Sequence, residues 1–145
     1  FKSTTLLSAE DIRAHIVPAY KQIIDQVHAR RKPFLLHSCG NIFNVMEDLI
    51  QTAGIDAKHS NEDQIAPFPV WAARYGDRIG NFGGIDTDAV CRLDRAGLKD
   101  YIHAVLAACE DKGGIAFGSG NSIPDYVPTE GYLNMVDIVR HYRGE

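Results

Sequence analysis

The sequence has few cysteines, no surplus of basic residues and no long apolar run, and each shortage excludes a class of protein. Its 145 residues include three cysteines, an odd number without framework spacing, which favours a reduced compartment over secretion. The net charge of −4 argues against a nucleic-acid-binding surface. No apolar stretch approaches the ~20 residues that a membrane-spanning helix needs, and no signal peptide is visible. We therefore expect a cytoplasmic protein that binds neither nucleic acid nor membrane.

The remaining composition is that of an ordinary globular protein. A hydrophobic content of 45% and a charged content of 23% are typical of soluble proteins, and the length suffices for one modest core. The sequence contains no low-complexity segment and no linker, so residues 1–145 are expected to form a single domain. It begins with Phe1 rather than methionine, which suggests a fragment or a processed product.

Helical and strand patterns alternate along the sequence. A capping box at Ser8–Asp11 predicts a short helix, followed by a break and a longer helix that has Pro18 in its first turn and ends before Pro33. Four short apolar segments predict strands over 34–37, 55–60, 78–84 and 115–118. Helices are predicted after them over 41–53, 65–75, 87–111 with a break near 93–94, and 129–142.

This order predicts a parallel α/β sheet in which a helix precedes four strand–helix units. Right-handed crossovers place the C-terminal ends of all four strands on one rim. Four units are half of an eight-stranded TIM barrel, and a small open α/β sheet is the alternative. A half-barrel exposes two sheet edges and its apolar lining. We therefore expect either a homo-oligomer or completion by an N-terminal half-barrel.

The end of the first strand carries a pair of residues typical of metal sites. His37 and Cys39 stand two residues apart, so on a strand their side chains point to the same side. A neutral imidazole and a thiolate together suit zinc, which binds nitrogen and sulfur ligands tetrahedrally. The alternative is a buried histidine beside a small core cysteine.

Polar residues also follow the second strand, and chemistry in such folds gathers at strand ends. Glu62 is the expected third zinc ligand; with His37 and Cys39 it would leave the fourth position open, as in catalytic zinc sites. His59 is either a competing ligand or a residue that orients one. The alternative for Glu62 is a solvated residue before a helix N-terminus.

The third and fourth strands end in candidate substrate contacts. Asp86 is either a proton acceptor in the cleft or the cap of the following helix. Ser119, Asn121 and Ser122 follow the fourth strand and are the expected substrate-binding residues. The loop 118–121 would expose backbone N–H groups where barrels often hold anions.

Four motifs in order give the sequence a family resemblance. The segments His37–Asn41, Tyr75–Arg78, Gly83–Asp86 and Gly118–Pro124 resemble the C-terminal half of the uroporphyrinogen decarboxylase superfamily. That superfamily includes corrinoid-linked methyltransferases and is related to cobalamin-independent methionine synthase. The resemblance implies that the chain is the C-terminal half of a TIM (β/α)8 barrel, with these units as the last four of eight.

The resemblance also implies a metal and a reaction. The methyltransferase branch binds zinc through a His-x-Cys pair, an acidic residue after the next strand and a cysteine near the end. His37, Cys39 and Glu62 match the first three positions, whereas the final cysteine falls on Ser119. The implied chemistry transfers a methyl group to a small-molecule thiol, with a corrinoid as a cofactor carried by a partner protein.

Three functions stay open at this point. A zinc-dependent methyltransferase-like enzyme is preferred, with Glu62 and Asp86 as catalytic carboxylates. The first alternative is a porphyrinogen decarboxylase, a lyase of porphyrin biosynthesis. Its cleft needs cations for the substrate carboxylates, and Arg74, Arg78 and Arg92 are the candidates. The second alternative is a non-catalytic barrel fragment.

Overall fold

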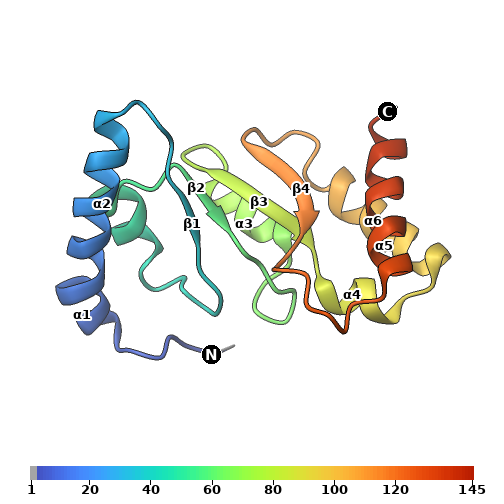
Figure 1. Cartoon of the computed structure of the whole chain (residues 1–145), viewed down its shortest axis with the longest axis horizontal. Coiled ribbons are helices and arrows are strands. Elements are labelled where there is room, and N and C mark those ends of the chain that lie inside the picture. The colour runs from blue at the N-terminus through green and yellow to red at the C-terminus, as the bar shows by residue number, and fades with distance from the viewer. Residues whose placement is uncertain (1–2) are drawn as a thin grey trace.

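A single parallel sheet of four strands organises the chain (Figure 1). The structure is a computed structural model and describes residues 3–145. The strands lie side by side in chain order, each parallel to the one before it. They are β1 (Leu35–His37), β2 (Ala57–His59), β3 (Gly80–Ile85) and β4 (Ile115–Ser119). The predicted parallel α/β order is thereby confirmed.

The connections between the strands are helical and cover one face of the sheet. The α-helices are α1 (Ala9–Asp11), α2 (Val17–Ala29), α3 (Phe68–Tyr75), α4 (Thr87–Arg92), α5 (Arg95–Ala107) and α6 (Thr129–Tyr142). Two further stretches, η1 (Ile12–Ile16) and η2 (Asp48–Ala53), are π-helices. In Figure 1, α1 and α2 flank β1, α3 lies behind the sheet, and α5 and α6 flank β4. No helix among residues 3–145 is long and apolar enough to cross a membrane.

Several predicted boundaries are wrong, for local reasons. The longer helix predicted with Pro18 in its first turn is confirmed as α2, but the expected break before it does not occur, because the π-helical turn η1 leads directly into α2. The helix predicted from 65 begins at Phe68, after Pro67. Asn41 does not cap a helix; its side chain accepts a hydrogen bond from the Phe43 N–H and forms a turn.

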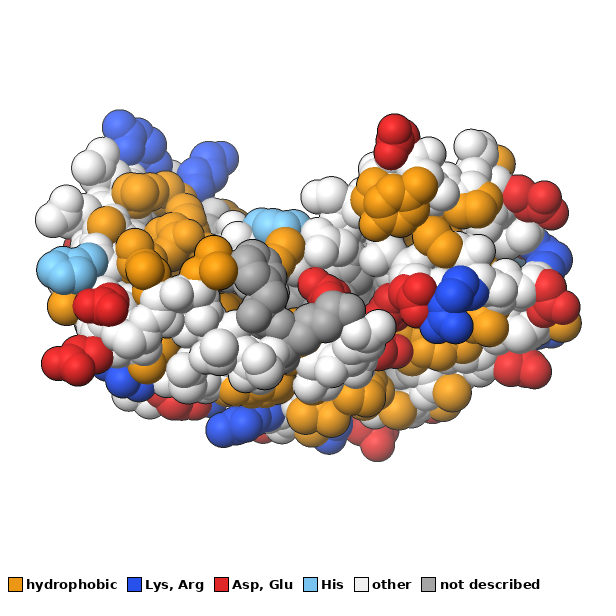
Figure 2. Space-filling view, turned by 90° about the horizontal axis from the view of Figure 1, so that it is seen from below, with side chains coloured by type: hydrophobic (Ala, Val, Ile, Leu, Met, Phe, Trp, Pro, Cys, Tyr) orange, Lys and Arg blue, Asp and Glu red, His pale blue; other side chains and the backbone are white. Residues whose placement is uncertain are grey.

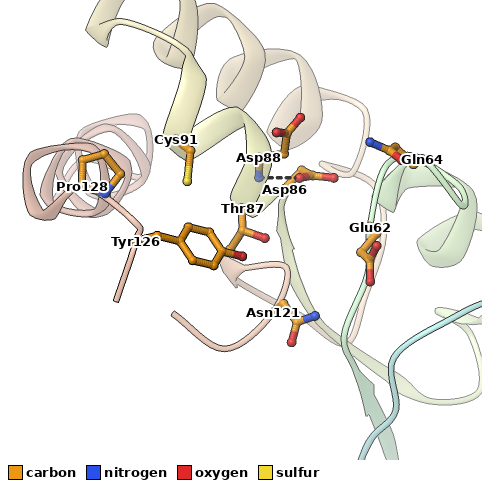
Figure 3. A pocket seen from close by; sticks show the side chains of 9 residues that line it. All are labelled: Glu62, Gln64, Asp86, Thr87, Asp88, Cys91, Asn121, Tyr126 and Pro128. Carbon is orange, nitrogen blue, oxygen red and sulfur yellow. Dashed lines mark hydrogen bonds between the residues drawn. The ribbon is translucent and has the colours of Figure 1, made fainter. Parts of the chain in front are cut away.

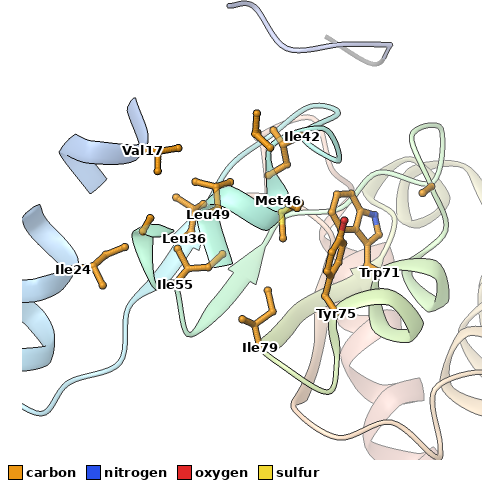
Figure 4. Close-up of a cluster of buried hydrophobic side chains, with 13 residues drawn as sticks. Val17, Ile24, Leu36, Ile42, Met46, Leu49, Ile55, Trp71, Tyr75 and Ile79 are labelled. Carbon is orange, nitrogen blue, oxygen red and sulfur yellow. The ribbon is translucent and has the colours of Figure 1, made fainter. Parts of the chain in front are cut away.

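Two clusters of buried apolar side chains fix the helices on the covered face. The first packs α2, η2 and β1 together, with Ile24 and Met46 fully buried (Figure 4). The second lies between β3 and α4–α6 and includes Ile85. Helix α3 serves both, because Trp71 belongs to the first cluster and Phe68 to the second. This packing holds all four strands in one curved sheet.

The opposite face of the sheet lacks a covering layer. Leu35 on β1 is 46% exposed and Phe82 on β3 is 37% exposed, and Ala116, the register partner of Phe82 on β4, is also exposed. Figure 2, seen from below Figure 1, shows the molecule hollowed between its two flanks. The outer edges of β1 and β4 pair with no other strand in residues 3–145. The sheet has the open lining and two free edges expected of a half-barrel.

Candidate functional site

Two histidines and a backbone carbonyl join three strand ends. His37 and His59 are register partners on β1 and β2, and their Nδ1 atoms lie 2.7 Å apart. The Nε2 of His59 lies 3.1 Å from the carbonyl oxygen of Ser119, at the end of β4. These contacts form a chain of hydrogen bonds across the rim.

The direction of this chain fixes the proton positions. A carbonyl oxygen only accepts hydrogen bonds, so Nε2 of His59 must donate to Ser119. The tautomer of His59 that donates from Nε2 offers its Nδ1 as an acceptor for the Nδ1–H of His37. Burial, followed by the nearby His59 and Lys58, lowers the pKa of His37. His37 is therefore neutral at pH 7, with its Nε2 free of a proton.

The bare nitrogen of His37 faces the sulfur of Cys39. Its Nε2 lies 3.4 Å from the Cys39 Sγ, and the thiol is exposed. Asn121 Nδ2 and Ser60 Oγ lie 3.5 and 3.7 Å from the same sulfur, and both can donate to a thiolate. Gly40 follows with φ 86°, a left-handed conformation that favours glycine. The local sequence thus turns the chain directly after the thiol.

The spacing of His37 and Cys39 can be compared with the geometry of a zinc site. Tetrahedral zinc, with bonds of about 2.0 Å to nitrogen and 2.3 Å to sulfur, separates two such ligands by roughly 3.5 Å. The observed distance of 3.4 Å between His37 Nε2 and Cys39 Sγ fits this value. Within residues 3–145, however, no three His, Cys, Asp or Glu side chains are grouped as metal ligands. The third ligand predicted from the sequence, Glu62, does not join the pair in this structure.

Glu62 instead lines a separate cavity of about 410 Å³, on the other side of Asn121 (Figure 3). The backbone around it is held from both sides. Asn61 N–H donates to the Gly120 carbonyl at 2.8 Å, and Asp63 N–H donates to Asp86 Oδ2 at 2.6 Å. These tertiary hydrogen bonds, invisible in the sequence, set the direction of the loop that carries Glu62.

The carboxylate of Asp86 accepts hydrogen bonds from two backbone segments. Its Oδ1 accepts the Asp88 N–H at 2.7 Å and caps α4, while its Oδ2 accepts the Asp63 N–H. Tyr101 donates to Asp63 Oδ2 at 2.7 Å and accepts the Asp86 N–H at 3.1 Å. Both oxygens of Asp86 are thus used by backbone donors, which favours its predicted capping role over proton transfer.

The loop after β4 is held together by its own polar groups. Ser119 Oγ donates to the Asn121 carbonyl at 2.7 Å, and Asn121 Oδ1 accepts the Ser122 N–H at 2.8 Å. Gly120 N–H donates to the Ile85 carbonyl. One of the N–H groups predicted to bind an anion, that of Gly120, is therefore already satisfied. Of the predicted substrate-binding residues, only Asn121 touches the His37–Cys39 pair.

Sequence reasoning missed one charged residue at the site, Lys58. It is 4% exposed, with its Nζ 4.1 Å from the Trp71 ring centre, and it donates to the Ser60 carbonyl. Burial lowers the pKa of its ammonium group to about 8, an effect that the charge of Cys39 opposes. Only its place on β2, one residue before His59, could have suggested it.

Comparison with known proteins identifies the family and the fold to which the chain is similar. Residues 2–142 match the sequence model for uroporphyrinogen decarboxylase (URO-D). The chain belongs to the uroporphyrinogen decarboxylase family. Its fold is similar to that of a methyltransferase from Methanosarcina mazei, with a TM-score of 0.77 and 18% sequence identity. That match covers 95% of this chain but 39% of the methyltransferase, as expected for the C-terminal half of a TIM barrel. No curated protein matches the sequence.

The three arginines considered as candidates for a decarboxylase contact other side chains. Arg78 forms an ion pair with Glu47, at 2.7 and 2.8 Å, and Arg92 pairs with Asp88. Arg74 lies over the Phe43 ring, 5.2 Å from its centre. The cavity beside Glu62 is lined by Asp86, Asp88 and other residues, none of them cationic. The described lining of this cavity is therefore acidic.

The surroundings of Asp63, which include Tyr101, predict that the stability of the fold depends on pH. Burial raises the pKa of Asp63, opposed by the Tyr101 hydrogen bond. An acid with a raised pKa in the folded state stabilises the fold below its unfolded pKa, and this contribution is lost as pH rises through the folded value. The parent chain should therefore lose this contribution as pH rises from 3 to 7, whereas Asp63→Asn has none to lose. The free energy of unfolding of the variant minus that of the parent should increase over this range.

Urea unfolding at several pH values measures this difference. Tyr101→Phe is the companion variant, because removing the phenol takes away the hydrogen bond that holds the pKa of Asp63 down. Its pH dependence should be steeper than that of the parent chain. A difference between Asp63→Asn and parent that stays constant from pH 3 to pH 7 would contradict the prediction.

Proposed function

We propose that the chain is the zinc-binding half of a methyltransferase-like barrel that methylates a small thiol. The observation that carries the proposal is the contact between His37 Nε2 and the exposed Cys39 sulfur, which lie 3.4 Å apart. The methyltransferase fold and the family membership support it. The absence of cations around both rim cavities in the described residues disfavours the decarboxylase.

His37 and Cys39 would hold the zinc, and the residues around them prepare both ligands. Zinc at this point would lower the pKa of a substrate thiol, so that the thiol is a thiolate at neutral pH. The relay through His59 keeps the coordinating nitrogen of His37 unprotonated. Asn121 and Ser60 donate hydrogen bonds to the Cys39 sulfur.

The proposed transfer is a displacement at a methyl carbon. The substrate thiol loses its proton, and its sulfur forms a bond to the methyl carbon. The bond between that carbon and the donor breaks, and the donor keeps the electron pair. A methylated corrinoid on a partner protein is the proposed donor. Glu62, across Asn121 from the pair, is the proposed acceptor of the thiol proton or a ligand that swings in on metal binding.

Cobalt substitution combined with a cysteine variant tests the site. Co2+ bound to the parent chain should show thiolate-to-metal charge-transfer absorption. Cys39→Ala should remove this absorption and weaken zinc binding by about 100-fold or more, beyond the 10–100-fold cost of changing outer contacts. The same variant should lose methyl transfer from methylcobalamin to a thiol.

Cys91→Ala is the matched control, because it also removes one thiol. Cys91 is partly exposed, and its loss leaves the His37–Cys39 pair intact. It should retain the absorption and the zinc affinity. Equal zinc affinity in the parent chain, Cys39→Ala and Cys91→Ala would refute a metal site at the pair.

A further inference from the structure

An apolar cavity is lined in part by Cys39. It has a volume of about 260 Å³, and Ser38, Cys39 and Gly40 form one wall. Aliphatic side chains form most of the rest: Leu6, Leu7, Ile12, Ile16, Ile42 and Val45. For comparison, a dry cavity of roughly 150 Å³ is large enough to bind benzene. The space beside the thiol therefore suits a small apolar group.

Residues 4–7 of the N-terminal segment line one side of this cavity, and the segment is tied to the motif that carries Cys39. Asn41 Nδ2 donates to the Ser3 carbonyl at 3.4 Å, and Thr5 Oγ1 donates to the Leu7 carbonyl at 2.5 Å. Ser8 then caps α1 through the Asp11 N–H at 3.0 Å. Residues 3–8 thus form a strap that is fixed at both ends.

The lining sets the charge of what can bind. Among residues 3–145, the cavity lining contains no Lys, Arg, Asp, Glu or His, so a charged group entering it would lose its hydration without gaining a partner from these residues. The neighbouring cavity, across Asn121, is lined by Glu62, Asp86 and Asp88. An anionic ligand at Cys39 would meet an apolar wall on one side and carboxylates on the other.

We propose that this cavity binds the methyl-accepting substrate, a small uncharged thiol with a short alkyl or aryl group. The apolar group lies among Leu7, Ile16 and Ile42, and the sulfur points to Cys39. The cavity then selects the substrate, while the His37–Cys39 pair activates it. This assignment rests on the proposed function for the thiol, but its apolar part can be tested without metal.

Toluene and benzyl mercaptan are suitable probes, because they differ only by the thiol. In the metal-free chain, millimolar toluene should shift the methyl NMR signals of Ile12, Ile16 and Ile42 in a saturable manner. Leu7→Glu should weaken toluene binding by about tenfold or more, since it places a charge in the wall. Leu93→Glu is the matched control: Leu93 is 39% exposed, Leu7 is 49% exposed, and Leu93 lies outside the cavity. Thermal unfolding of both variants confirms that they fold.

Measurements with added zinc distinguish the cavity assignment from the proposed function. With zinc bound, benzyl mercaptan should bind more tightly than toluene and be methylated in preference to mercaptoacetate. If folded parent chain shows no saturable shifts with toluene, the cavity assignment fails. If toluene binds but zinc adds nothing for benzyl mercaptan, the cavity stands and the proposed function fails. If mercaptoacetate is methylated as well as benzyl mercaptan, the function stands and the assignment of an uncharged substrate fails.

Discussion

Ser119→Cys is expected to tighten zinc binding by at least about 100-fold, since even outer contacts of a metal ligand change affinity 10–100-fold. Ser119 ends β4, and its carbonyl oxygen already accepts the His59 hydrogen bond that orients His37. The substitution would add a thiolate to a site that presents one nitrogen and one sulfur. Chelator competition measures the affinity of the parent chain and the variant.

Two further variants isolate the contribution of the new thiolate. Ser119→Ala removes the hydroxyl that bonds to the Asn121 carbonyl without adding a ligand, and it should not tighten binding. The double variant Ser119→Cys and Cys39→Ala should lose the gain, because the two thiolates would share one metal. If Ser119→Cys leaves zinc affinity unchanged, the residues at β1 and β4 do not share a site, and the methyltransferase interpretation fails.

The second large effect concerns association of the chain with itself. The open face exposes Leu35 and Phe82, and both outer strands have free edges. Two copies would supply the eight strands of a closed barrel, in which each β4 edge meets the β1 edge of the other copy. We therefore predict a dimer or a larger assembly at ~10 μM, the scale on which exposed apolar surface drives association.

Phe82→Lys should shift this assembly to monomer, because it places a charge in the centre of the lining. Val70→Lys is the control, since Val70 is 45% exposed but lies on α3, the helix behind the sheet in Figure 1. Light scattering after size exclusion measures the mass of each. A folded monomer of the parent chain at micromolar concentration would show that the open face needs no partner.

The sequence allowed the His37–Cys39 pair to be predicted because the period of two along a strand is a local rule. The four parallel strands also followed from local patterns, since each apolar segment was bounded by glycine, proline or a capping residue. Capping of α4 by Asp86 was one of two open interpretations. The structure favours it through two backbone donors on one carboxylate.

The position of Glu62 could not be predicted, because it depends on partners far along the chain. Gly120 holds the residue before it, and Asp86 holds the residue after it. Lys58 was missed for a related reason. A lysine in a short strand suggests a solvated position, whereas Trp71 and the Ser60 carbonyl bury its ammonium group. Such tertiary contacts override the local pattern at the rim.

The order of the strands has a consequence for how the chain acquires its structure during synthesis. Every strand pairs with the one that precedes it, as Leu35 does with Ala57 and Asn81 with Ile115. The sheet can therefore grow at one edge as each unit leaves the ribosome, with no strand waiting for a distant segment. Pairing between near neighbours in the chain keeps loop closure short, which favours rapid folding. The unit of β4 and α6 follows the other three and carries the Ser119 carbonyl, so the hydrogen bond from His59 to that carbonyl can form only after all four strands have been synthesised.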